Sequence, residues 1–198
     1  MRALFAGALA VTLLLPQAQP LSAQASVDFA ERSNWLVGYM VNAPQQLVGF
    51  GTGVVLSRLG GFGVYVDAKL THDSPARDSG FLENMTPQEA MDRGDIFFKD
   101  DSAWTTVNIA VVKGISEELA LYLGAGPAWR TFYSQFEETP PAELSPLGLY
   151  WVEDEVRSEV HANVTAGGFF RMGRRVVFQF GAGTAPAGFT AGFHFLLR

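Results

Sequence analysis

The sequence predicts an all-β protein, an eight-stranded antiparallel up-and-down transmembrane barrel that follows a cleaved signal peptide. Segments of about ten residues alternate between apolar and small or polar side chains, and that length suits a tilted strand crossing a bilayer. Hydrophobic residues make up 48% of the chain and charged residues only 17%. A soluble exported domain usually carries more charge, so much of this surface must face something other than water.

The N-terminus has the features of a secretory signal peptide. An apolar run of about ten residues follows Arg2, and it is too short to cross a membrane as a helix. Small residues come next, so we expect cleavage after Ala23 or Ala25. The chain then divides into a signal peptide at 1–25 and one barrel domain at 26–198. No later apolar stretch reaches the length of a transmembrane helix, so strands must do the crossing.

The alternation is clearest at the C-terminus. Odd-numbered residues from Phe189 to Leu197 are apolar, and the even-numbered ones between them are small or polar apart from Leu196. Such a strand separates an apolar face from a polar one. An even number of strands closes the sheet, as a bilayer requires. The eight predicted strands lie near 34–42, 47–57, 62–72, 104–113, 118–133, 158–171, 175–183 and 187–197.

The connections also alternate, with tight turns at one end of the predicted barrel and two long linkers at the other. The linkers, 73–103 and 134–157, hold eight acidic and three basic residues, and six acidic and one basic, so together they carry a formal charge of −10. The tight-turn end is basic. Within the first linker, Thr86-Pro87-Gln88-Glu89 predicts a short helix with a capping box, which Gly94 ends. The predicted tight turns are Ser57–Gly61, Gly114–Glu117 and Met172–Arg174, and the short connections on the linker side are Ala43–Gln46 and Thr184–Ala187.

The alternation places several charged and titratable side chains inside the barrel. Charges in so narrow an interior must pair, because burying them singly is costly. We therefore expect an internal network that plugs the barrel rather than a catalytic or conducting site. Its predicted members are Asp67, Lys69, Arg130, Glu159, His161 and His194.

The chain resembles the small eight-stranded outer-membrane barrels of Gram-negative bacteria, the OmpA- and OmpX-like superfamily. The stretch from Val107 to Ala128 is similar to the central hairpin of that superfamily, and the C-terminal strand is similar to its assembly signal. Members usually end on an aromatic residue, whereas here the last apolar residue is Leu197, followed by Arg198. The resemblance implies a location in the outer membrane, contact with its lipids and lipopolysaccharide, and recognition of the last strand by the barrel-assembly machinery.

Three functions remain open from the sequence. The first is a structural or surface-interaction barrel acting through acidic extracellular loops, with an unknown extracellular partner. The second is a narrow channel or small-ligand transporter. The third is a soluble periplasmic lipocalin-like barrel, in which the apolar face would point inward.

We expect no enzyme activity, no cofactor, no metal site and no binding of nucleic acid. The lipid A deacylase barrels place a histidine and a serine two residues apart on one strand. Here the residue two after His161 is Asn163, which cannot serve as that nucleophile. The acidic linker residues do not match the spacing of a calcium loop, and basic residues are few and scattered.

Overall fold

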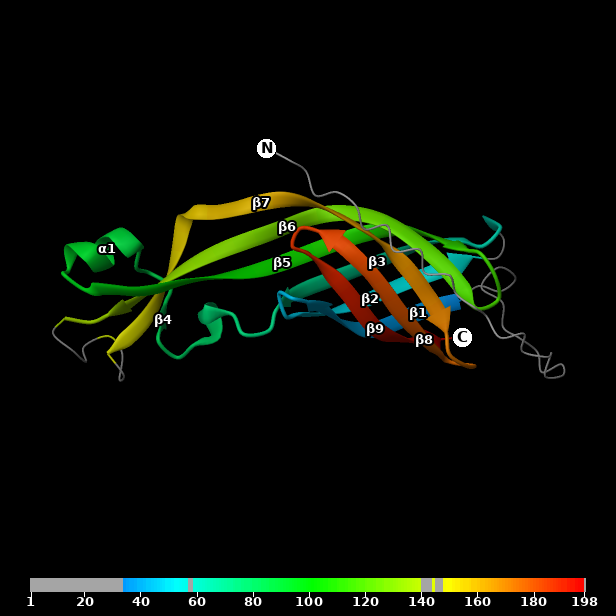
Figure 1. The fold of residues 1–198 in the computed structure, drawn as a ribbon, viewed down its shortest axis with the longest axis horizontal. Helices are drawn as coiled ribbons and strands as arrows, with labels where there is room; N and C mark the ends of the chain where they lie inside the picture. Colours follow the sequence, from blue (N-terminus) through cyan, green and yellow to red (C-terminus); the bar gives the residue numbers. More distant parts are fainter. Residues whose placement is uncertain (1–33, 57–58, 140–143, 145–147, 198) are drawn as a thin grey trace, which may run out of the picture.

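The computed structural model describes residues 34–56, 59–139, 144 and 148–197, and it forms one elongated molecule (Figure 1). The predicted signal peptide and its cleavage site lie outside these residues. Among the described residues, no helix is both long and apolar enough to cross a membrane.

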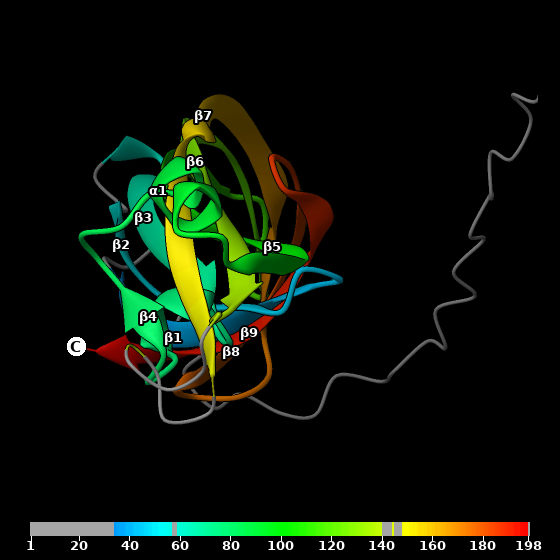
Figure 2. The same cartoon turned by 90° about the vertical axis from the view of Figure 1, so that its left-hand side faces the viewer.

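Eight strands form a closed antiparallel barrel, which confirms the predicted fold class. Each barrel strand pairs with the next barrel strand along the chain, and β9 pairs with β1. The strand order around the barrel is β7-β6-β5-β3-β2-β1-β9-β8, and pairing of β8 with β7 completes the ring (Figure 2). Closure leaves no edge within the barrel wall. The barrel strands are β1 (Asn34–Ala43), β2 (Leu47–Leu56), β3 (Phe62–Thr71), β5 (Ile96–Gly114), β6 (Leu119–Glu137), β7 (Leu149–Arg171), β8 (Val176–Thr184) and β9 (Ala187–Leu197).

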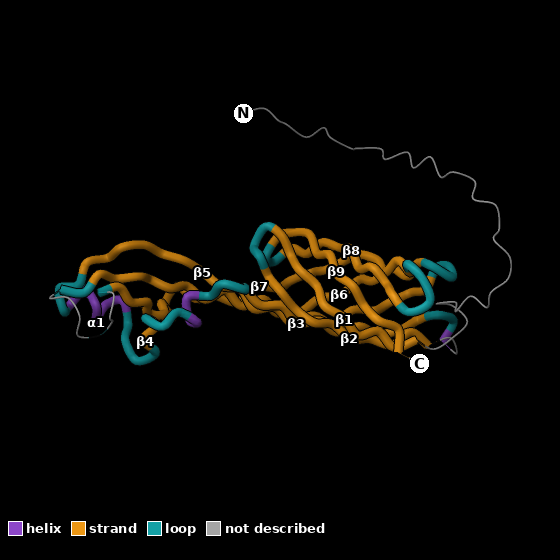
Figure 3. The backbone as a smooth tube through the Cα atoms, turned by 90° about the horizontal axis from the view of Figure 1, so that it is seen from below, coloured by secondary structure: helices purple, strands orange, loops and turns teal. Residues whose placement is uncertain are grey.

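Three of these strands are much longer than the membrane requires. β5 and β6 have 19 residues each and β7 has 23, whereas β1, β2 and β3 have ten. We call the barrel end with the β1–β2 and β8–β9 turns the mouth, and the opposite end the turn end. β5, β6 and β7 continue past the mouth as a sheet (Figure 3).

This extension corrects the prediction of two long linkers. Much of 73–103 and 134–157 is strand, because β5 begins at Ile96, β6 continues to Glu137 and β7 begins at Leu149. We call the described residues at 72–103, 131–139, 144 and 148–158 the head. Its other elements are η2 (Pro75–Arg77), the two-residue strand β4 (Phe81–Leu82) and α1 (Pro87–Asp92), with β4 parallel to β7.

The predicted helix is present as α1, with its capping box complete. Thr86 Oγ1 accepts a hydrogen bond from the backbone N–H of Glu89, and the Glu89 carboxylate accepts one from the N–H of Thr86. These bonds satisfy donors that a helix start leaves free. Gly94 follows the helix with a φ of +87°, a conformation that glycine adopts at little cost.

Candidate functional site

Apolar side chains fill the lumen toward the turn end. Tyr65, Phe169 and Leu36 are completely buried there, so side chains close the lumen at this level. Gly51 makes room for the Tyr65 ring, because a Cβ at position 51 would overlap the phenol oxygen. An eight-stranded barrel has little more interior than its own side chains occupy. The buried cluster is Leu36, Met40, Val55, Tyr65, Ala110, Val112, Ala120, Tyr122, Phe169, Val177 and Leu196.

A polar layer crosses the lumen between this cluster and the mouth. Lys69 Nζ lies 2.5 Å from Asp67 Oδ1, and both side chains are buried. Asn108 Nδ2 donates to the same oxygen at 2.8 Å, and Asn163 Nδ2 donates to Asn108 Oδ1 at 2.8 Å. Asn163 Oδ1 then accepts from two backbone N–H groups at the β8–β9 turn, at 3.0 and 2.9 Å. The layer thus ties β3, β5 and β7 to that turn.

His194 belongs to a separate buried group. Its Nε2 lies 2.9 Å from the hydroxyl of Tyr65, which also donates to Gln179 Oε1 at 3.3 Å. Gln179 Nε2 donates in turn to the hydroxyl of Tyr122 at 3.2 Å. His194 Nδ1 has no hydrogen-bond partner among the described residues. This arrangement holds the aromatic cluster together across four strands.

Arg130, Glu159 and His161 lie at the mouth, where each side chain is between a third and a half exposed. Arg130 Nη1 is 3.7 Å from Glu159 Oε1, and His161 Nε2 is 3.0 Å from the same oxygen. The His161 contact has an ion-pair distance but lacks the geometry of a hydrogen bond, since this nitrogen has no hydrogen-bond partner among the described residues. The six predicted interior residues therefore do not form one network. Asp67 and Lys69 form a buried pair, His194 contacts Tyr65 apart from the other five, and Arg130, Glu159 and His161 form a partly exposed trio.

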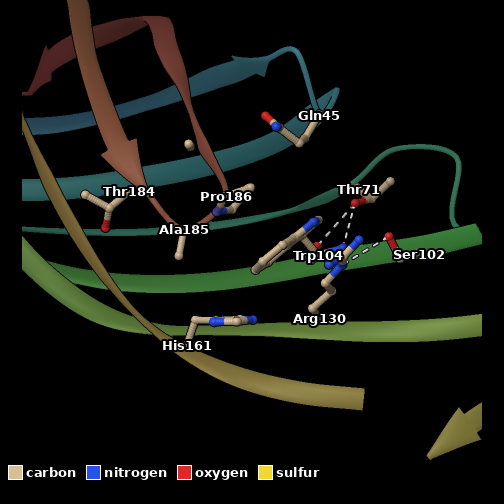
Figure 4. A pocket seen from close by; sticks show the side chains of 10 residues that line it. Gln45, Thr71, Ser102, Trp104, Arg130, His161, Thr184, Ala185 and Pro186 are labelled. Carbon is tan, nitrogen blue, oxygen red and sulfur yellow. Dashed lines mark hydrogen bonds between the residues drawn. The ribbon is translucent and has the colours of Figure 1, made fainter. Parts of the chain in front are cut away.

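A cavity of about 480 Å³ opens at the mouth above the polar layer (Figure 4). Trp104, Arg130 and His161 face it from β5, β6 and β7, and Gln45 and Pro186 face it from the two turns opposite. The Trp104 and His161 ring centroids are 5.4 Å apart, and the Arg130 guanidinium carbon lies 5.5 Å from the Trp104 ring. This cavity combines aromatic surface, charge and amide groups, a mixture typical of small-molecule sites.

The head has an apolar core on each face of its sheet. On one face, Phe136, Tyr150 and Val152 pack against Ala90 of α1. On the other, Tyr133 and Trp151 pack against Phe81 of β4. Side chains of a strand alternate between faces, so the two clusters lie on opposite sides. A protrusion with two such cores is an ordered structure rather than a pair of solvated loops.

Asp95 is the polar centre of the first of these cores. It accepts hydrogen bonds from the Tyr150 hydroxyl at 2.5 Å and the Thr139 backbone N–H at 2.9 Å, and Arg93 Nε lies 3.2 Å away. Burial raises the pKa of Asp95, but these hydrogen bonds outweigh burial and hold the pKa below its ordinary value. Burial, together with the neighbouring Asp95, raises the pKa of Tyr150.

β5 forms an edge of the head sheet. It pairs with β3 only as far as Thr105, so among the described residues its 96–103 segment has a strand neighbour on one side alone, β6. Ile96, Phe97 and Phe98 are all more than half exposed at the tip of this edge. The pairing with β6 shifts register between Phe97 and Lys99. Free edges of this kind can bind another extended chain.

The outer wall of the barrel is apolar around its circumference. Ile109, Leu121 and Phe180 point outward as the alternation predicts, and Phe189 is 77% exposed. Trp35 and Trp129 also face outward, near the turn end and the mouth, where aromatic girdles of membrane barrels lie. A closed barrel with an apolar wall belongs in a bilayer. The protein is a small eight-stranded β-barrel with an apolar outer wall.

No protein-family description and no curated protein matches the sequence. The structure is similar to Ail, the attachment invasion locus protein of Yersinia pestis, with 15% identity and a TM-score of 0.45 over 83% of this chain and 94% of that chain. It is also similar to the N-terminal β-barrel domain of Pseudomonas aeruginosa OprF, with 11% identity and a TM-score of 0.41 over 84% of this chain and 98% of that one.

Ail has also been solved in a phospholipid bilayer nanodisc, with 15% identity to this chain and a TM-score of 0.45 over 84% of this chain and 99% of that one. It has been solved too with the heparin analogue sucrose octasulfate, with 13% identity and a TM-score of 0.43. These values describe a likeness of overall shape. The barrel assignment rests on the strand pairing and the apolar wall described above.

Sequence reasoning missed two parts of this site. The sequence does not identify Trp104 and Gln45 as cavity residues. They come from segments far apart in the chain, and alternation within one strand does not say which residues of other strands it meets. The sequence does not reveal the head sheet either, although the capping box of α1 can be read from it. Among the described residues, no group of three or more His, Cys, Asp or Glu side chains is placed to hold a metal ion.

Proposed function

We propose that this protein is a surface-interaction barrel in which the barrel anchors the head and the head meets partners outside the cell. The observation that carries the proposal is the continuation of three strands past the mouth with an apolar core on each face. Ordering so many residues costs conformational entropy. A barrel that only filled the membrane could use short turns at this end, as it does between β1 and β2.

The acidity of the head and its free β5 edge indicate which kind of partner it would bind. The segments 73–103 and 134–157 carry a formal charge of −10, which favours encounter with a basic surface. The edge offers backbone groups and exposed Phe97 and Phe98 side chains to an extended segment. We therefore propose a partner protein with a basic, extended segment.

Two alternatives are less well supported. A narrow channel needs an open lumen, whereas Tyr65, Phe169 and the Asp67–Lys69 pair fill this one. A lipocalin-like soluble barrel needs its apolar face inside, whereas Ile109 and Phe189 point outward.

β9 has a second proposed role, in assembly. Its outward Phe193, Phe195 and Leu197 and its position at the seam between β1 and β8 suit a segment read by the barrel-assembly machinery. Lipopolysaccharide would surround the outer wall near the mouth, where Trp129 lies.

The orientation of the head can be tested by labelling, because the chain has no cysteine. A Gln88→Cys variant in α1 should react with a bulky, membrane-impermeant maleimide on intact cells. A Glu117→Cys variant at the turn end should react only after the outer membrane is opened. Labelling of position 117 alone on intact cells would mean that the head faces the periplasm.

The interaction itself can be tested at the edge strand. Cells displaying a Phe97→Ser variant should bind less of a basic, strand-forming peptide than cells displaying the wild type. Val156→Ser is the matched control, since Val156 is an exposed apolar residue of the head that lies on β7 and not at the β5 edge. Equal peptide binding by all three would remove the edge from the proposal.

A further inference from the structure

The mouth cavity holds several polar groups with unused hydrogen-bonding capacity. Gln45 Oε1 is a buried atom with no hydrogen-bond partner among the described residues, and His161 Nε2 has none beyond its ion-pair contact with Glu159 at 3.0 Å. Arg130 makes a long hydrogen bond from Nε to Ser102 Oγ, at 3.4 Å, and its Nη1 is 3.7 Å from Glu159. Buried polar atoms are normally satisfied, so groups left in this state around one cavity indicate a missing polar partner.

A second unpaired acceptor lies next to Gln45. Asn42 is 5% exposed and uses its Nδ2 on Thr190 Oγ1, whereas its Oδ1 has no partner among the described residues. Asn42 Oδ1 and Gln45 Oε1 are both 3.0 Å from the point where a side chain at Gly188 would begin. Both side-chain carbonyl oxygens therefore lie beside Gly188. The residue before it, Ala187, lines the cavity.

The charge of the mouth is close to balanced. Glu159 lies within ion-pair distance of both Arg130 and His161, so it offsets the charge of the guanidinium. A site for a phosphate or a carboxylate would instead concentrate uncompensated donors. The balance favours a neutral ligand that both donates and accepts hydrogen bonds.

The remaining walls suit the carbon face of such a ligand. The Trp104 and His161 rings, Ala185 and Pro186 supply apolar surface. The Asp67–Lys69–Asn108 layer reaches the β8–β9 turn, which lines the cavity, through Asn163. Its volume of about 480 Å³ is within the usual range for small-molecule sites, about 300–1,000 Å³.

We propose that the mouth cavity binds an uncharged saccharide of one or two rings, with Gln45, Arg130 and His161 contacting hydroxyl groups and Trp104 lying against the ring. Hydroxyl groups donate and accept at once, which matches acceptor and donor groups set side by side. This site is separate from the β5 edge of the head.

The test uses the full mature barrel in nanodiscs or in a detergent without a sugar headgroup. The probes are glucose, N-acetylglucosamine and maltose, with glucuronate and glucose 6-phosphate as charged counterparts. Binding is followed by saturation-transfer NMR and calorimetry. We expect saturable binding of at least one neutral sugar and weaker binding of the charged ones.

Variants decide whether binding occurs at this cavity. Gln45→Ala should weaken binding about 2- to 10-fold, the loss expected for one hydrogen bond. Folding should be unaffected, because Gln45 Oε1 makes no hydrogen bond to the described residues. Gln46→Ala, in the same turn but not lining the cavity, should leave binding unchanged. Trp104→Ala should abolish binding, and heat-modifiable migration on gels checks that each variant is folded.

Three results would overturn the proposal. They are no saturable binding of any neutral sugar, tighter binding of glucuronate or glucose 6-phosphate than of glucose, and equal weakening by Gln45→Ala and Gln46→Ala. None of them bears on peptide binding at the β5 edge, so failure here leaves the proposed function standing or falling by its own test.

Discussion

At the scale of single residues, the side of the barrel wall on which a residue lies decides what a substitution costs. Ile109 points outward near the middle of the barrel wall, where it pairs with Val66 of β3 and Ala125 of β6. We expect Ile109→Arg to lower the free energy of unfolding by about 2–4 kcal/mol, because it places a charge in lipid. Urea unfolding in lipid vesicles measures this cost.

A matched arginine separates the effect of lipid from that of the substitution. Val156 is 97% exposed in the head, so Val156→Arg should change stability by less than about 0.5 kcal/mol. If Ile109→Arg were as stable as Val156→Arg, position 109 would not lie against lipid.

The two lumen ion pairs should differ in the same measurement. Lys69→Met leaves Asp67 buried and should cost about 3–5 kcal/mol. Arg130→Met affects a partly exposed pair and should cost about 1 kcal/mol or less. The alternation predicts the same role for Lys69 and Arg130, as members of one internal network. Their different burial in the structure predicts different costs.

A double variant tests whether Asp67 and Lys69 act as a pair. Asp67→Asn combined with Lys69→Met should cost less than the sum of the two single changes. Strict additivity would show that the two side chains stabilise the barrel independently.

At the scale of elements, the sequence predicts a strand well where its two faces meet different surroundings. β3 and β9 alternate because lipid lies on one side and a narrow lumen on the other, and period-2 alternation reveals this. In the head, residues Tyr133 to Phe136 of β6 are all buried, since each face has its own core. Alternation disappears there, and the extension is read as a linker.

The same reasoning explains which site residues could be predicted. Asp67, Lys69 and His194 follow from alternation within one strand. The cavity at the mouth depends on the register that brings Trp104 opposite Arg130 and Ala128 opposite His161. Sequence periodicity sets which face a residue takes but not which residues of other strands it meets.

The head should lose order in acid before the barrel does. The pKa of Asp95 is lowered from its ordinary 3.8, so the stability it contributes is present at neutral pH and is lost as the pH falls below about 4. Trp151 fluorescence, in a variant with the other tryptophans changed to Phe, should report this loss of packing.

Removing the titrating group provides the control. Asp95→Asn should weaken the head at neutral pH and abolish the acid-dependent change in Trp151 fluorescence. An unchanged acid transition in Asp95→Asn would show that protonation of Asp95 does not cause it.

At the scale of the whole molecule, the contents of the lumen predict poor conduction. An ion crossing the barrel would meet the polar layer of Asp67, Lys69 and Asn108 and then the fully buried Tyr65 and Phe169. Moving a charge through the buried Tyr65 and Phe169 side chains would cost much free energy, because they would replace its hydration. We therefore expect no large, steady single-channel current from the purified wild type in a planar bilayer.

Opening the plug should change this outcome. Phe169→Ala removes a ring from the closed level of the lumen and should cost about 3–5 kcal/mol in stability, and if the barrel stays folded it should conduct more than the wild type. Phe193→Ala removes a ring from the outer wall and should leave conduction unchanged. A large current from the wild type itself would mean that the lumen side chains move apart in the bilayer, and the channel function would then replace the anchoring role proposed for the barrel.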